Sequence, residues 1–270
     1  MTEGSNSKEL TRLLAIYEDL LEQHMSQGKP WSVYENRPGN RNPNYSKCLQ
    51  ILQEEFNINF NTLFTQSNGG NGIDPDVAVL LCKLVKNTMI KRVMEIGVGL
   101  STFLLSTICE QENKYLISLE DTLQWSQHYN RGLENAGISH RIVASDNDPA
   151  NIPDFISPQD DFQLAWVDGG IFCKGEKFPP RCQDRHGSVF YYKEVLKNAV
   201  IMFDDGEDLN FRRSADPLLK EMGRDPNDPA QTFFFNPTER WNRWQYVILP
   251  EANHPIREVF TEVENIIKEG

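Results

Sequence analysis

The chain has 270 residues and a formal net charge of −12, with 39% apolar and 24% charged residues. This composition is typical of a globular chain that is long enough for one large α/β domain with a substantial core. The acidic balance argues against nucleic acid and against an anionic membrane surface as partners, because either would require a basic face. No apolar run is long enough to span a bilayer.

The N-terminus and the cysteines bear on the cellular location. Residues 1–4 lack the basic and apolar regions of a secretory signal. The five cysteines are odd in number and scattered, and no pair has the spacing of a zinc site. We therefore expect the protein in a reducing cytoplasm.

The first part of the chain is predicted to be helical. Helices are expected at 8–27 and 45–56, separated by a loop rich in Gly, Pro, Asn and Arg. We expect the first helix to pack on the main domain or on a second copy of the chain, which would make a homodimer. The glycine-rich run Asn68–Gly72 is predicted to be a joint. It divides the chain into a helical extension, 1–72, and a main domain, 73–270.

The main domain is predicted to begin with a helix after Asp74-Pro75, since an N-cap residue followed by proline is a common helix start. The apolar run from Arg92 to Ile96 then indicates a buried strand. It is followed by a turn with two glycines, Gly97 and Gly99, which let the backbone bend tightly and approach a ligand.

A helix from 103 to 110 is expected after this turn, capped by Ser101 and Thr102. Glu95 lies just before the turn, where its carboxylate could orient the loop or take a cationic group of a ligand. Such a turn is weak evidence by itself, because many α/β proteins use it for packing. Thr102 also stands where the dinucleotide-binding pattern has its third glycine.

Four further apolar runs follow, and each ends in an acidic residue. The runs are 115–119, 141–144, 162–167 and 199–203, and the acids that follow them are Glu120, Asp146 after Ser145, Asp168, and the pair Asp204-Asp205. Helix-sized segments between strands predict a parallel sheet. Ligands bind at the carboxyl ends of such strands. The sequence therefore predicts a row of carboxylates at the ligand-binding edge.

The last part of the domain changes character. Residues 171–187 have no apolar period and are predicted to be a loop over the site, followed by a helix at 188–196. Two strands, 232–236 and 245–249, are so close in sequence that they must be antiparallel. A final helix is predicted at 255–268.

These features together resemble the class I S-adenosylmethionine-dependent methyltransferases, over roughly residues 73–250. The resemblance implies an α/β, Rossmann-like fold: a mostly parallel seven-stranded sheet with an antiparallel C-terminal hairpin and helices on both faces. The runs Gly72–Asp76 and Glu95–Gly99 look like the metal-dependent catechol and caffeoyl-CoA O-methyltransferases. The pair Asp204-Asp205 looks more like the macrocin-type sugar O-methyltransferases.

The resemblance implies roles for the strand-end residues toward S-adenosylmethionine. It places Glu120 on the ribose hydroxyls, where a carboxylate accepts two hydrogen bonds. Ser145 and Asp146 would lie near the adenine. The methionine end would be lined by the residues of the first turn and its flanks: Glu95, Gly97, Gly99, Ser101 and Thr102, with Asp168 also close to the cofactor.

A divalent cation, such as Mg²⁺, is predicted at Asp168, Asp204 and Asp205. Three carboxylates in a partly dry site repel one another, and a hard cation bound through oxygen removes that cost. The metal would hold an acceptor hydroxyl and lower its pKa. Alternatively, Asp205 caps a loop or helix, and Asp204 pairs with an arginine such as Arg212 or Arg213.

The catalytic base is predicted less specifically. Lys174 follows Asp168 in the loop, His186 has the more suitable unperturbed pKa, and Asp168 could serve as both ligand and base.

The predicted function is O-methylation of a hydroxyl on a small molecule, such as a natural product, a sugar or a phenol. Two alternatives stay open. One is aminopropyl transfer to a polyamine, which uses a related fold and an acid-rich site. The other is a binding protein that keeps the fold without the chemistry.

Overall fold

The computed structural model describes most of the chain from residue 43 onward. The described residues are 43–67, 73–120, 122–144, 156–157, 159–168, 192–204, 219–236 and 245–268. The helix predicted at 8–27 and the loop predicted at 171–187 lie outside these ranges.

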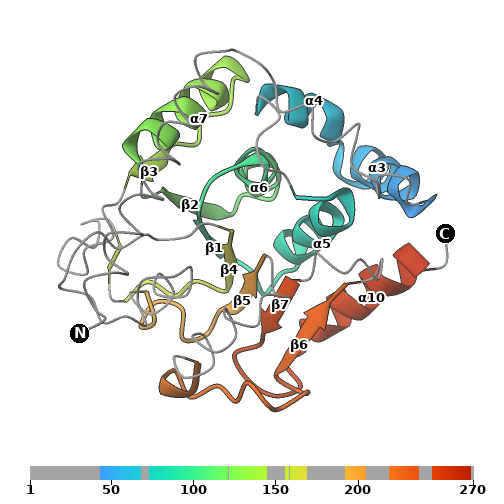
Figure 1. Ribbon diagram of the computed structural model, residues 1–270, viewed down its shortest axis with the longest axis vertical. Coiled ribbons are helices and arrows are strands. Elements are labelled where there is room, and N and C mark those ends of the chain that lie inside the picture. The colour runs from blue at the N-terminus through green and yellow to red at the C-terminus, as the bar shows by residue number, and fades with distance from the viewer. Residues whose placement is uncertain are drawn as a thin grey trace, which may run out of the picture. The chain divides into compact units, whose positions relative to one another are not determined.

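The centre of the fold is a seven-stranded mixed sheet in the order β3-β2-β1-β4-β5-β7-β6 (Figure 1). The strands are β1 (Arg92–Ile96), β2 (Tyr115–Glu120), β3 (Ile142–Ala144), β4 (Leu164–Val167), β5 (Val200–Phe203), β6 (Thr232–Phe235) and β7 (Gln245–Ile248). The first five run parallel, and β7 lies antiparallel between β5 and β6. The predicted sheet, including its antiparallel terminal hairpin, is therefore confirmed.

Six helices accompany the sheet in the described part of the chain. They are α3 (Pro43–Phe56), α4 (Phe60–Gln66), α5 (Pro75–Lys86), α6 (Leu100–Gln111), α7 (Leu123–Asn135) and α10 (Arg257–Lys268). Four correspond to the helices predicted at 45–56, after Asp74-Pro75, at 103–110 and at 255–268. Helix α7 occupies one of the helix-sized segments between predicted strands, and α4 was not predicted. At the predicted helix 188–196, the described residues from 192 onward form turns. None of the described helices combines the length and the apolar character that a bilayer crossing requires.

Two apolar cores cover the two faces of the sheet, because side chains alternate along each strand. In β1, Val93 belongs to one core, and Met94 and Ile96 to the other. The first core receives residues from all six helices, and α5, α6 and α7 lie along this face in Figure 1. The second core is completed by Tyr192, Leu196 and Leu219, among others.

Helices α3 and α4 precede the predicted joint at 68–72 and form an outer layer, with α3 beside α5 and α4 beside α6 (Figure 1). Leu52, Phe56 and Phe60 contribute to the same core as α5. The boundary after residue 72 stays a prediction.

The strand order reverses at β1. The chain proceeds outward from β1 to β2 and β3, and then returns to the other side of β1 to form β4 and β5. In open α/β sheets, ligands bind in the crevice outside the carboxyl ends of the strands at such a switch point. The glycine turn follows β1 at this point.

Candidate functional site

The glycine turn after β1 has the backbone geometry that its sequence predicts. Gly97 has φ +84°, a left-handed value that strains other residues, and its N–H donates to the Leu119 carbonyl at 2.9 Å. Helix α6 then begins at Leu100 with Gly99 as its N-cap residue. The predicted helix start after Ser101 and Thr102 is therefore wrong, although Thr102 does take part in the cap. Both lie in the first turn, and Thr102 Oγ1 accepts a 3.0 Å bond from the Gly99 N–H.

Glu120 at the end of β2 is tied to this turn. Its Oε2 atom accepts a 3.3 Å bond from the N–H of Val98, and its Oε1 atom accepts a 3.0 Å bond from the N–H of Thr122. The residue is only 7% exposed. The carboxylate therefore joins the carboxyl end of β2 to the loop between β1 and α6.

Glu95 points into the interior beneath the turn and is completely buried. Ser101 Oγ of α6 donates to its Oε1 at 2.6 Å, and Ser118 Oγ of β2 donates to its Oε2 at 2.5 Å. The Nε2 atom of His140, before β3, lies 3.0 Å from Ser118 Oγ. One buried carboxylate thus links β1, α6 and β2, and a histidine is attached through Ser118.

Burial controls the protonation of these groups. Loss of water raises the pKa of Glu95 to about 7, although the bonds from Ser101, Ser118 and Thr102 act in the opposite direction. Burial, helped by the charge of Arg141, lowers the pKa of His140 to about 4. Burial, with the charge of Glu95, raises the pKa of the Cys109 thiol to about 12. At neutral pH His140 and Cys109 are neutral, and Glu95 is near its titration midpoint.

Asp168 and Asp204 lie at the ends of adjacent strands. They follow Val167 of β4 and Phe203 of β5, which are register partners. Asp204 is 4% exposed, and its Oδ1 accepts a 2.9 Å bond from Gln245 Nε2 at the start of β7. Asp168 is partly exposed. The sheet therefore brings two of the three predicted metal ligands to neighbouring positions, while Asp205 lies outside the described residues.

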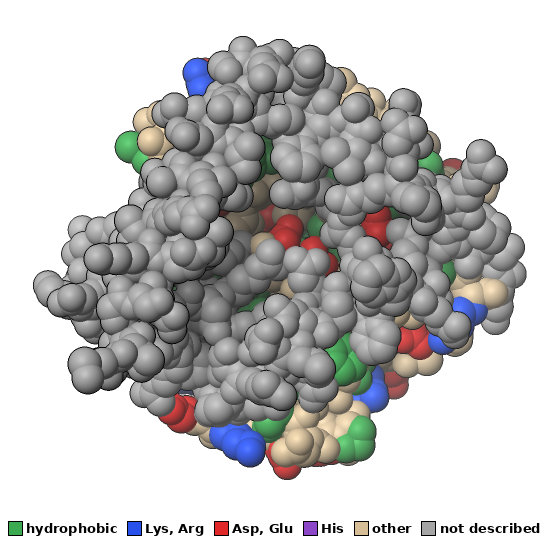
Figure 2. Space-filling model, viewed as in Figure 1, with side chains coloured by type: hydrophobic (Ala, Val, Ile, Leu, Met, Phe, Trp, Pro, Cys, Tyr) green, Lys and Arg blue, Asp and Glu red, His purple; other side chains and the backbone are tan. Residues whose placement is uncertain are grey.

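Two further acids are buried at the start of α5, a helix whose C-terminal end leads toward the amino end of β1. Asp74 occupies the predicted N-cap position, but its side chain does not form the capping bond. Asp76 is buried as well, and its Oδ1 accepts from the N–H of Val77 at 2.9 Å. Figure 2 shows acidic side chains gathered near the centre of the view, where β1, β4 and β5 lie in Figure 1.

Known structures share this architecture. A candidate O-methyltransferase from Klebsiella pneumoniae aligns with a TM-score of 0.50 and 15% identity, over 77% of this chain and 98% of that chain. The chain has the methyltransferase fold.

Two other structures with this fold match less well. For a candidate caffeoyl-CoA O-methyltransferase from Staphylococcus aureus, the TM-score is 0.49 and the identity 14%, over 75% of this chain and 98% of that chain. For an O-methyltransferase from Bacillus cereus in complex with S-adenosylhomocysteine, the values are 0.43 and 11%, over 80% and 95%. No protein-family model and no curated protein matches the sequence. The likeness at these identities concerns the fold, so the activity must be argued from the residues.

Several predicted site residues lie outside the part of the chain that the structure describes. They are Ser145 and Asp146 at the predicted adenine position, Asp205 of the predicted metal site, and Lys174 and His186, which were predicted as bases. Their roles in the methyltransferase fold stay predictions.

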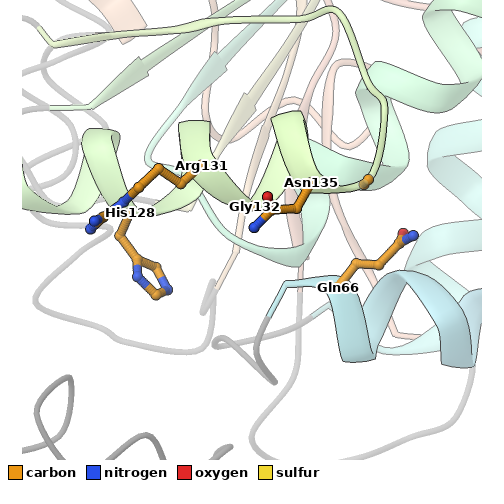
Figure 3. A pocket seen from close by; sticks show the side chains of 6 residues that line it. Gln66, His128, Arg131, Gly132 and Asn135 are labelled. Carbon is orange, nitrogen blue, oxygen red and sulfur yellow. The ribbon is translucent and has the colours of Figure 1, made fainter.

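A pocket of about 280 Å³ lies between α4 and α7. Figure 3 shows Gln66 of α4 on one side and His128, Gly132 and Asn135 of α7 on the other, and Arg131 also lines the pocket. None of the acids at the strand ends lines this pocket. It was not predicted from the sequence.

The sequence reasoning also missed Ser118, His140 and Gln245. Ser118 had a detectable signal, because it is a polar residue inside an otherwise apolar strand and occupies a fully buried position. Gln245 was assigned only as the first residue of a strand, and nothing local distinguishes it from an exposed glutamine. His140 stands before β3 without any motif around it.

Proposed function

We propose that the protein is an S-adenosylmethionine-dependent methyltransferase that transfers a methyl group to a hydroxyl of a small molecule. The observation that carries this proposal is the link between the glycine turn and Glu120 at the switch point of the sheet. A buried strand-end carboxylate held against a glycine turn is suited to a ligand with a hydroxyl pair and a cationic group.

The residues fit the cofactor chemically. The N–H groups of Val98 and Thr122 fix the Glu120 carboxylate at the end of β2, and a carboxylate is a suitable acceptor for the two ribose hydroxyls. The positive φ of Gly97 lets the backbone bend tightly beside the ligand position. The acids at the neighbouring strand ends favour a ligand that carries a sulfonium and an ammonium group.

We further propose that Asp168, Asp204 and Asp205 hold a divalent cation such as Mg²⁺. Asp168 and Asp204 offer oxygen ligands at adjacent strand ends, which suits a hard cation. Among the described residues, no group of three potential ligands is found, and Asp205 would have to complete the set. When bound, the cation would lower the pKa of the acceptor hydroxyl and orient it toward the methyl group.

In the proposed reaction, the acceptor oxygen forms a bond to the methyl carbon as the bond between that carbon and sulfur breaks. The products are the methyl ether and S-adenosylhomocysteine, and the hydroxyl proton passes to a base. We propose Asp168 as this base, with Lys174 and His186 as the predicted alternatives. Glu120 and the glycine turn hold the cofactor and take no part in the proton transfer.

Calorimetry with S-adenosylhomocysteine tests cofactor binding, and an absence of binding at about millimolar ligand would reject the proposal. Turnover of hydroxylated acceptors with and without a chelator then tests the metal, because activity that persists after chelation would exclude it. Aminopropyl transfer would be favoured instead by turnover of putrescine with decarboxylated S-adenosylmethionine. Cofactor binding without any methylated product would favour the non-catalytic binding protein.

A further inference from the structure

His140, Ser118, Glu95 and Ser101 form one continuous line of polar contacts inside the domain. The distances are 3.0 Å from His140 Nε2 to Ser118 Oγ, 2.5 Å from Ser118 Oγ to Glu95 Oε2, and 2.6 Å from Ser101 Oγ to Glu95 Oε1. Glu95, Ser101 and Ser118 are buried, and His140 is partly exposed. The line runs from the segment before β3 to the first turn of α6.

The direction of these bonds follows from counting hydrogens. While Glu95 is ionised, the single hydroxyl hydrogen of Ser118 is donated to its carboxylate, so Ser118 Oγ can only accept from His140. The accepted hydrogen must be on Nε2, which makes His140 the Nε2–H tautomer. Because burial keeps this imidazole neutral, its other nitrogen carries no hydrogen.

Glu95 holds the two flanks of the glycine turn together. It lies two residues before Gly97, and its partner Ser101 lies two residues after Gly99. Glu95 and Ser118 are register partners on β1 and β2, so the hydroxyl approaches the carboxylate from the neighbouring strand. A carboxylate that rotated away from Ser101 would release the first turn of α6 from β1.

We propose that Ser118 and His140 are positioning residues of the cofactor-binding turn. The donor of His140 orients the Ser118 hydroxyl toward Glu95, and Glu95 then fixes Ser101 and the loop that contains Gly97 and Gly99. This inference rests on the proposed function, because it assumes that the turn binds the cofactor. His140 touches neither the turn nor Glu95 directly in this arrangement and acts through Ser118.

Among the groups around Glu95, the residues of this line of contacts supply most of the hydrogen bonds to its carboxylate. Hydrogen bonds to its carboxylate come from Ser101 and Thr102 on α6 and from Ser118 on β2. Cys109 on α6 is close enough to feel its charge but is a neutral thiol, and Lys114 acts on that thiol. On β4, the register partner is Trp166, whose buried indole N–H has no hydrogen-bond partner among the described residues. Arg141, which is exposed, acts on His140.

Loss of the His140 donor should make protonation of Glu95 easier. A protonated Glu95 has to donate a hydrogen itself, which requires Ser118 or Ser101 to turn its hydroxyl and accept. The bond from His140 opposes this reversal at Ser118, since it occupies an acceptor position of Ser118 Oγ. Without the bond from His140, the ionised form of Glu95, which accepts from both Ser101 and Ser118, becomes less favoured. Glu95 then takes up a proton at a higher pH, and the glycine turn loses its attachment to Glu95 at that pH.

The test is S-adenosylhomocysteine affinity, measured by calorimetry from about pH 5.5 to about pH 8.5, a range in which His140 stays neutral. The variants are His140→Leu, which removes the donor, His140→Gln, whose amide N–H can replace it, and Ser118→Ala. The matched control is His254→Leu, a partly exposed histidine before α10 that accepts a bond from the Ile256 N–H. Circular dichroism confirms that each variant is folded.

We expect His140→Leu to bind S-adenosylhomocysteine about 3- to 10-fold more weakly near neutral pH, for the loss of one hydrogen bond, and Ser118→Ala, which loses two, to bind at least as weakly. The acid limb of the affinity profile, the pH range in which affinity falls on acidification, should shift to higher pH by about half a unit or more. His140→Gln should retain the wild-type profile, and His254→Leu should not move it.

The outcomes separate this inference from the proposed function. If the wild type binds and His140→Leu leaves the acid limb unchanged, the positioning role is rejected while the proposed function stands. The same conclusion follows if His140→Gln is as defective as His140→Leu, because volume and not the donor would then matter. If the wild type itself does not bind, the proposed function is rejected and this inference with it.

Discussion

Gln245 Nε2 donates a 2.9 Å hydrogen bond to Asp204 Oδ1, and both residues are almost completely buried. The bond crosses from β7 to the end of β5, its antiparallel neighbour. Burial of a carboxylate costs free energy unless hydrogen bonds satisfy its oxygens. A hydrogen-bond partner that does not itself bind the metal also fixes the direction in which the other carboxylate oxygen points. Gln245 therefore orients one of the proposed metal ligands.

The first prediction concerns Gln245→Leu. We expect the affinity for Mg²⁺ to fall by about 10- to 100-fold, which is typical of losing a partner of a metal ligand. The measurement is titration of methyl transfer with Mg²⁺, supported by direct calorimetry of Mg²⁺ binding. Gln50→Leu on the exposed side of α3 is the control. An unchanged Mg²⁺ dependence in Gln245→Leu would contradict the proposed ligand role of Asp204.

The second prediction concerns Glu120→Gln. The amide cannot offer acceptors on both sides, so its NH₂ group would face the N–H of Val98 or Thr122, or a ribose hydroxyl. We expect the cofactor affinity to fall by about 10- to 100-fold, because bonds to a charged acceptor are lost. Calorimetry with S-adenosylhomocysteine measures this. Glu110→Gln, at an exposed position of α6, should bind normally. Equal affinity of both variants would remove Glu120 from the site.

The sheet was predictable because each strand is a short apolar run that ends in a polar residue. The runs ending at Glu120, Asp168 and Asp204 became β2, β4 and β5 to within two residues. Helix α4 was missed because its seven residues are too few to show a helical period.

The start of α6 shows how a tertiary contact can override a local signal. Ser101 and Thr102 look like N-cap residues, since short hydroxyl side chains usually bond to the first free N–H groups. Here the Ser101 hydroxyl is used by Glu95, a contact with a residue on the preceding strand. The helix starts earlier, after Gly99, whose N–H bonds to the Thr102 hydroxyl.

The candidate site was predicted where it depends on strand ends and was missed where it depends on buried side chains. Parallel strands determine where Asp168 and Asp204 lie relative to each other. By contrast, the contact between Ser118 and His140 joins residues 22 positions apart, and no period or motif connects them. To predict a side-chain contact of this kind, one has to know the register in which β1, β2 and β3 pair.

The third prediction concerns Gly132→Ala in α7. A methyl group at this position would approach the Phe103 ring to 2.9 Å and the Gln66 carbonyl oxygen to 3.5 Å. Phe103 is fully buried, so its ring has little room to move. Alanine gains up to about 1 kcal/mol in helix propensity, but overpacking costs about 1–3 kcal/mol.

We therefore expect Gly132→Ala to lower the free energy of unfolding by about 1 kcal/mol, as measured by urea denaturation. Asn135→Ala, at an exposed position of the same helix, is the control and should not be destabilised in this way. A net stabilisation of Gly132→Ala would show that the Phe103 ring of α6 can move aside at little cost.

The fourth prediction concerns the pH dependence of stability. Burial raises the pKa of Glu95 from 4.5 to about 7. The folded protein therefore keeps a proton that the unfolded chain loses between these values, and the folding stability due to this proton is fully present below pH 4.5. That stability is lost as the pH rises through about 7, and it amounts to roughly 3 kcal/mol.

Glu95→Gln removes this titration. The amide that this substitution introduces resembles the protonated carboxyl group, so the variant should be about as stable as the wild type at acidic pH. Between about pH 5 and about pH 8 the wild type should lose roughly 3 kcal/mol of stability relative to the variant, because only Glu95 gives up a proton. Urea unfolding at intervals across this range measures it, with Glu110→Gln as the exposed control. A constant difference would mean that the pKa of Glu95 is the same in the folded and unfolded states, and burial would then not be the dominant influence on it.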